Sequence, residues 1–117
     1  ASKYWPGALT IVIPSKGKQT AILTSKDKTL GLRIPNSHVA QSLMKETGPL
    51  LTSSANISGF TGYIKAEDIA LDFPKVGILG PIPWGKSSGK ASTIIFWKKS
   101  GDWRLIRKGD VLVKELN

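Results

Sequence analysis

The stretch "LLTSSANISGF" (Leu50–Phe60) joins an apolar start to a run of small polar residues. Its two leucines predict a short buried strand over Pro49–Ser54. Ser53, Ser54 and Asn56 would then emerge at the carboxyl end of this strand, where open α/β sheets bind their ligands. Their hydroxyl and carboxamide groups suit a ligand that itself carries charge, such as a phosphate or an amino acid. A turn held by Asn or Ser side chains explains the same residues equally well.

Around this stretch, apolar β-branched runs predict strands, and capped periodic segments predict two helices. The predicted strands are Leu9–Ser15, Gln19–Ser25, Thr29–Pro35, Val76–Leu79, Ala91–Lys98 and Asp102–Lys108, and the predicted helices are Asn36–Gly48 and Lys65–Phe73. Asp110–Leu116 suits either a short helix or an edge strand. On the first helix Val39, Leu43, Met44 and Thr47 share one face, which predicts packing on the core. The expected class is α/β or α+β, a twisted mixed sheet with flanking helices.

Length and composition narrow the function classes. A chain of 117 residues predicts one domain, 1–117. No apolar run approaches the ~20 residues of a membrane span, so we expect a cytoplasmic protein with no membrane partner. There is no cysteine and only one histidine, so disulfides and thiolate metal sites are excluded and we expect no protein-bound metal.

The charge points to polyanionic partners. Seventeen Lys and Arg face eight Asp and Glu, a net charge of +9. Such a surface attracts nucleic acid, nucleotide phosphates or anionic lipid, although most of these lysines are expected only to solvate the surface. The stretch Trp84–Lys108 differs because it interleaves indoles with cations, a pattern that suits base stacking beside phosphate contacts. Ordinary strands with one buried face would give the same pattern.

Two sequence features that resemble catalytic motifs are better explained without catalysis. Gly80–Ser87 matches the P-loop pattern, but Pro81 and Pro83 remove two of the backbone N–H groups that a P-loop needs, and a strand rather than a helix is predicted to follow. His38 stands alone in a predicted first helical turn, where a structural role is expected. No nucleophile and base pair emerges, so no catalytic residue is assigned.

Five segments in chain order carry spaced signatures: "WPGALT" (Trp5–Thr10), "LGLRIPNSHVAQSLMKETG" (Leu30–Gly48), "PLLTSSANISG" (Pro49–Gly59), "STII" (Ser92–Ile95) and "LIRKGD" (Leu105–Asp110). Together they resemble the YrdC-like family of threonylcarbamoyl-AMP synthases, with S-A-N-x-S-G as the most specific element. The resemblance implies a nucleotidyltransferase that converts ATP, L-threonine and bicarbonate to threonylcarbamoyl-AMP and pyrophosphate. This product supplies the t6A modification of tRNA.

The resemblance also implies cofactors, partners and site residues. Mg²⁺ would arrive with ATP, and the partners would be the substrates, downstream t6A-transfer proteins and tRNA or double-stranded RNA. The implied nucleotide-binding residues are Ser54, Asn56, Arg107 and Thr29, and the implied threonine-binding residues are Arg33, Ser53 and Ser92.

Departures from the family pattern qualify this interpretation. The family's Lys-x-Arg motif occurs nowhere in the chain, and Phe96 stands where the family has Asp. The chain therefore resembles a partial domain, the C-terminal portion of a synthase, which is expected to be inactive alone. The alternative is a non-catalytic RNA- or nucleotide-binding module derived from that family. A partial domain would also place "LTIVI" or "STIIF" at an open sheet edge or in an oligomer contact.

Overall fold

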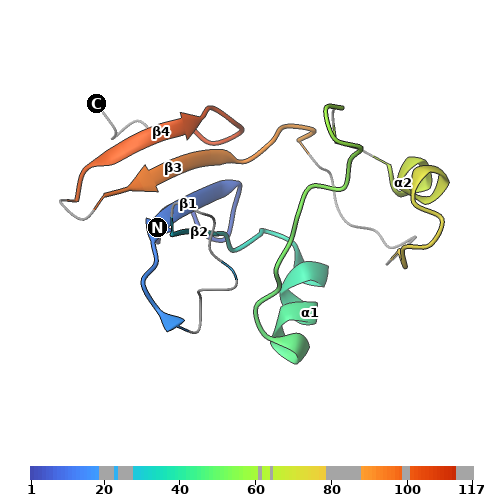
Figure 1. The fold of residues 1–117 in the computed structure, drawn as a ribbon, viewed down its shortest axis with the longest axis horizontal. Coiled ribbons are helices and arrows are strands. Elements are labelled where there is room, and N and C mark those ends of the chain that lie inside the picture. The colour runs from blue at the N-terminus through green and yellow to red at the C-terminus, as the bar shows by residue number, and fades with distance from the viewer. Residues whose placement is uncertain are drawn as a thin grey trace.

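A computed structural model describes residues 1–18, 23, 28–60, 62–63, 65–78, 88–98 and 101–112. Its elements are β1 (Leu9–Pro14), β2 (Thr29–Leu32), α1 (His38–Thr47), α2 (Ala66–Asp72), β3 (Thr93–Trp97) and β4 (Trp103–Arg107). The strands form one sheet in the order β2-β1-β3-β4 (Figure 1). The expected mixed α/β class is confirmed.

The central pair of the sheet is parallel. Leu9 of β1 pairs with Thr93 of β3, whereas β2 and β4 pair antiparallel with the outer sides of β1 and β3. Strands β1 and β3 carry the "LTIVI" and "STIIF" runs. The expectation that one of them forms an open edge is therefore wrong for the described sheet, whose edges are β2 and β4.

The core lies on one face of this central pair. Side chains alternate between the two faces of a strand, and Leu9, Ile11 and Ile95 fall on the same buried face. Tyr4 and Trp5 pack against them, and the Trp5 indole N–H donates a 2.7 Å hydrogen bond to the carbonyl of Leu9. The segment before β1 thus closes the core.

The helix expected over Asn36–Gly48 is confirmed as α1. Ser37 is the N-cap, and its hydroxyl accepts from the amide of Ala40 at 3.4 Å. Gly48 ends the helix at a φ of 78°, a value that glycine adopts without strain, and its amide donates to Met44. The helix expected over Lys65–Phe73 is confirmed as α2.

The packing expected of α1 is wrong. Among the described elements neither helix packs against a strand, and no residue of α1 is buried. The face formed by Val39, Leu43, Met44 and Thr47 is apolar in sequence, but Leu43 is exposed. Periodicity identifies an apolar face without identifying what covers it.

Two predicted strands are wrong. The Pro49–Ser54 segment is irregular and exposed, because no strand of the described sheet offers it a partner. Residues 76–78 form a bend and coil in place of the strand expected over Val76–Leu79. The strand expected over Gln19–Ser25 lies outside the described residues except for Leu23. The P-loop-like segment Gly80–Ser87 lies outside them entirely.

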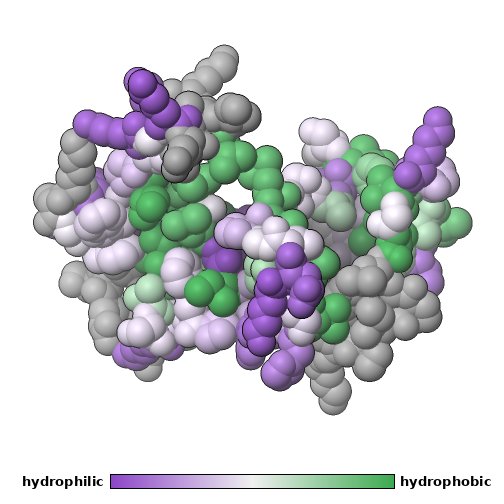
Figure 2. Space-filling view, turned by 90° about the horizontal axis from the view of Figure 1, so that it is seen from below, coloured by the Kyte–Doolittle hydropathy of each residue, from purple (hydrophilic) through white to green (hydrophobic). Residues whose placement is uncertain are grey.

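Large apolar side chains remain exposed on this fold. Leu51 and Leu71 keep 75% and 79% of their surface in contact with solvent. Figure 2 shows patches of apolar side chains among polar ones on the visible face of the molecule. The described elements therefore bury only a small part of their apolar surface. No described helix is long and apolar enough to cross a membrane.

Candidate functional site

A fixed guanidinium group stands at one end of the sheet. Arg107, the last residue of β4, donates from Nε and Nη2 to the carbonyl oxygen of Ser92 at 3.1 and 2.9 Å. Its Nη2 also donates to Ser92 Oγ at 3.1 Å, and Ser92 is only 8% exposed. Among the described residues Nη1 has no hydrogen-bond partner. Because Arg107 is exposed, an anion can reach the N–H groups of Nη1.

A β-bulge gives Arg107 its orientation. Ile95 pairs with Leu105, but Ile94 pairs with Arg107, so Ile106 has no partner on β3. Without the extra residue, Arg107 would share a face with Leu105 and the core. The bulge moves its side chain to the opposite face, which it shares with Ser92.

Thr10 of β1 adds a second hydroxyl to the polar cluster. Its Oγ1 lies 2.9 Å from Ser92 Oγ. Arginine can only donate, so Ser92 Oγ accepts from Arg107 and can donate its own proton to Thr10. The sequence did not single out Thr10 as a site residue. Its position in "WPGALT", the first of the spaced signatures, was the available signal.

Arg33 lies at the same end of the sheet. Its Nε donates to the carbonyl of Gly7 at 3.0 Å, and Gly7 precedes β1. Leu32 pairs with Ile11, so the residue after it lies beside the start of β1. Backbone contacts therefore bring a second guanidinium to the end that carries Arg107.

The segment after β4 is tied to the start of β3. The buried Thr93 hydroxyl donates to the carbonyl of Val111 at 2.6 Å and accepts from the amides of Gly109 and Val111 at 3.1 Å each. Gly109 lies so close to β3 that an added Cβ would collide with Ala91 O and would lie 2.5 Å from Thr93 N. This attachment holds the backbone on the C-terminal side of Arg107.

The site lies at the amino ends of the two central strands. Ser92 precedes β3, and Thr10 is near the start of β1, whereas Arg107 closes the antiparallel β4. Ser53, Ser54 and Asn56 follow no described strand, so the expectation that they emerge at the carboxyl end of a buried strand is wrong. Thr29 pairs with Pro14 at the other end of the sheet, so the structure does not bring it to Arg107.

The loop with Ser53, Ser54 and Asn56 lies beyond this end of the sheet, next in the chain to α1 (Figure 1). Both serines are exposed. The side-chain Nδ2 of Asn56 donates to the carbonyls of Ile57 and Phe60 at 3.0 Å each, which closes a turn. Its Oδ1 has no partner among the described residues. No hydrogen bond joins the described part of this loop to the Arg107 cluster, so their shared surface stays a prediction.

A comparison with known families identifies the family of this chain. The sequence model of the Sua5/YciO/YrdC family, described as "Telomere recombination", matches residues 1–109. The chain belongs to the Sua5/YciO/YrdC family. The match spans all five of the spaced signatures except the final Asp110, so the resemblance based on them is confirmed.

Several curated relatives of this chain are named as threonylcarbamoyl-AMP synthases or putative ones. The threonylcarbamoyl-AMP synthase of Bacillus subtilis is 36% identical over 80% of this chain and 28% of its own length. That of Serratia proteamaculans is 31% identical over 74% of this chain and 44% of its own length. The putative synthase of Mycobacterium leprae is 30% identical over 97% of this chain and 51% of its own length. The chain thus spans about half or less of the length of these relatives. No solved structure matches the chain significantly.

Proposed function

We propose that this chain provides part of the active site of a threonylcarbamoyl-AMP synthase that serves t6A modification of tRNA in the cytoplasm. The observation that carries the proposal is the Arg107 guanidinium, held on Ser92 with Nη1 open to an anion, in a family whose relatives are named for this reaction. Fixed donors of this kind suit phosphate, because they need no reorganisation when charge develops.

The reaction demands such a cation. The amine of threonine combines with bicarbonate and loses water to give a carbamate. An oxygen of this carbamate attacks the α-phosphorus of ATP, and the bond to pyrophosphate breaks. Negative charge grows on the phosphate oxygens in this step, and Arg107 would stabilise it. Mg²⁺ would enter with ATP as part of the substrate.

The family resemblance suggests roles for the other residues. Ser54 and Asn56 would contact the nucleotide, with the free Oδ1 of Asn56 as an acceptor. Arg33 and Ser53 would bind the threonine side. Ser92 would connect the two sides, because it orients Arg107. The position of Thr29 gives no support to a role at this end of the sheet.

The test compares two arginines of β4. Arg107→Gln removes the proposed phosphate contact, whereas Arg104→Gln removes the same charge from a guanidinium that lies over the Phe96 ring, 5.9 Å from its centroid. A charge-assisted hydrogen bond contributes about 1.5–3 kcal/mol, so R107Q should weaken ATP binding roughly 10- to 150-fold. R104Q should leave it within about twofold, because the paired strands place it near the hairpin. Equal losses from both variants would contradict the proposal.

A non-catalytic RNA- or nucleotide-binding module is the second candidate, favoured by the net charge of +9. Exchange of labelled pyrophosphate into ATP that requires threonine and bicarbonate would establish the synthase reaction in this chain. ATP binding that depends on Arg107 without exchange would support a partial site. RNA binding that falls steeply with salt, with no ATP binding, would favour the second candidate.

A further inference from the structure

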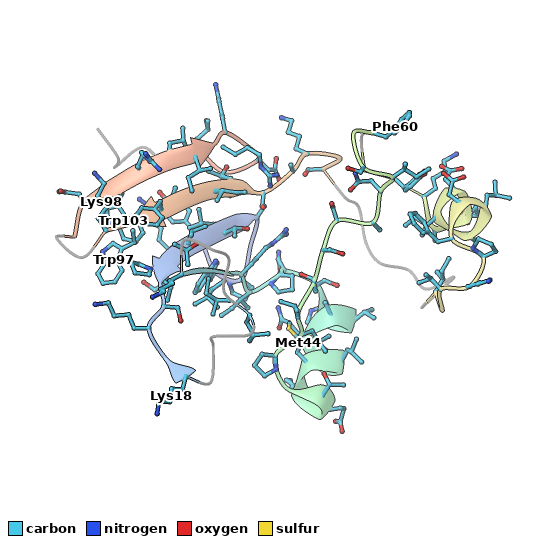
Figure 3. All side chains as sticks on the ribbon, viewed as in Figure 1. Lys18, Met44, Phe60, Trp97, Lys98 and Trp103 are labelled. Atoms are coloured by element: carbon cyan, nitrogen blue, oxygen red, sulfur yellow. The ribbon has the colours of Figure 1, made fainter. Side chains whose placement is uncertain are left out.

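We propose that Trp97, Trp103 and Lys98 form a stacking surface for unpaired bases of single-stranded RNA. The three residues lie at the hairpin end of the sheet, opposite the end that carries Arg107 (Figure 3). This surface uses none of the residues proposed to bind ATP or threonine.

The two tryptophans form an exposed aromatic pair. Trp97 of β3 and Trp103 of β4 are direct cross-strand partners, so their side chains lie on the same face. Their ring centroids are 6.3 Å apart at an interplanar angle of 45°, and the residues are 36% and 39% exposed. The tilt leaves ring surface open to a third aromatic group, and every nucleobase has a π-face that can occupy it.

A third tryptophan shows what a structural indole looks like in this chain. Trp5 packs against the core, and its indole N–H is bonded to the carbonyl of Leu9. Within the described part of the chain, the indole N–H groups of Trp97 and Trp103 have no such partner. Tryptophan usually satisfies this donor when it serves packing alone. The hairpin pair therefore presents polar edges as well as ring faces to solvent.

The charge at this end of the molecule suits phosphate. Lys98 follows Trp97 in the chain and is exposed, and two hydrogen bonds of the hairpin hold its backbone, from its amide to the carbonyl of Asp102 and from the amide of Gly101 to its carbonyl. Asp102 adds one carboxylate to the hairpin. Three of the eight acidic residues of the chain lie instead on α2, at the far side of the molecule (Figure 1). An RNA strand at the hairpin is thus separated from the densest negative charge.

Single strands are the form that this surface can read. Bases in a duplex are stacked on each other and hide their faces, whereas unpaired bases can stack on an indole while their phosphates contact lysine. The choice of RNA over DNA rests on the proposed function in tRNA modification. The stacking surface itself rests only on the geometry of the hairpin.

The test separates stacking from charge. The full chain is titrated, without ATP or threonine, with a mixed-sequence single-stranded oligoribonucleotide, its duplex and inorganic polyphosphate of equal charge. Trp97→Leu and Trp103→Leu should each weaken single-strand binding about tenfold and leave polyphosphate binding unchanged. Trp97→Phe, which keeps an aromatic face, should recover part of the affinity. Lys98→Gln should weaken both ligands and reduce the salt slope by about 1, more than the control Lys75→Gln beside α2.

Several outcomes would overturn the inference. One is equal weakening of RNA and polyphosphate by the tryptophan variants, and another is no weakening at all. Duplex binding that the tryptophan variants weaken as much as single-strand binding would do the same. ATP binding through Arg107 is measured separately. The proposed ATP site and the proposed RNA surface can therefore be refuted independently of each other.

Discussion

Replacement of Gly109 by alanine tests whether the attachment of the final segment to β3 supports the site. The added Cβ would collide with backbone atoms of Ala91 and Ser92 and lie 2.5 Å from Thr93 N, so no side-chain rotation can relieve the contact. Overpacking of this kind costs about 1–3 kcal/mol. The displaced Gly109 amide would also lose its 3.1 Å hydrogen bond to the Thr93 hydroxyl, about 1 kcal/mol more.

We therefore expect Gly109→Ala to lower the free energy of unfolding by about 2–4 kcal/mol, measured by urea denaturation followed by tryptophan fluorescence. Gly77→Ala is the matched control, because no atom lies within 4 Å of its added Cβ. It should change stability by less than about 1 kcal/mol. The Gly109 variant should also weaken ATP binding, because Arg107 is two residues away and would move off Ser92. Equal urea midpoints for the two variants would refute this account of the attachment.

Three further changes probe other contacts. Thr93→Val keeps the shape of a buried side chain but removes a hydroxyl that bonds Gly109 and Val111, so it should destabilise the fold by about 2 kcal/mol or more in the same denaturation assay. Asn56→Asp replaces the donor Nδ2 by an acceptor facing two carbonyls, so the turn should open, which faster amide hydrogen exchange after Asn56 would show. The Tyr63 hydroxyl donates to the Asp72 carboxylate, which raises the pKa of Tyr63 above its ordinary 10.0. This contact should stabilise the fold fully below pH 10 and be lost as the pH rises through the higher value; ultraviolet titration of phenolate should show the Tyr63 pKa falling in Asp72→Asn.

Local signals in the sequence predicted the local elements. The apolar β-branched run of β1 and the cap residues Ser37 and Gly48 of α1 act through neighbouring residues alone, and the strand and the helix predicted there are confirmed. The strand over Pro49–Ser54 failed because a strand needs a partner, and a chain segment does not carry information about what lies beside it.

The candidate site was predictable only in part. Ser92 and Arg107 belong to segments that the family resemblance picked out, and hydrogen bonds do join them. Simple alternation along β4 would place Arg107 with Trp103 and Leu105, whereas the structure places it on the other face. The cause is the bulge at Ile106, which depends on the register with β3 and has no local sequence signal. Thr10 was missed for the same reason, since only the parallel pairing sets it beside Ser92.

The parallel pairing of β1 with β3 also constrains how the chain can fold. Leu9 and Thr93 are far apart in the sequence, and the buried hydrophobic residues of the described core come from these two strands. During synthesis β2 emerges before β3, so within the described sheet β1 can pair early only with β2 and must wait for β3 on its other side. Pairings between residues so distant in sequence form slowly, and the waiting strand is exposed to aggregation. During synthesis, a chaperone that binds an apolar β-strand would therefore reduce the aggregation of unpaired β1.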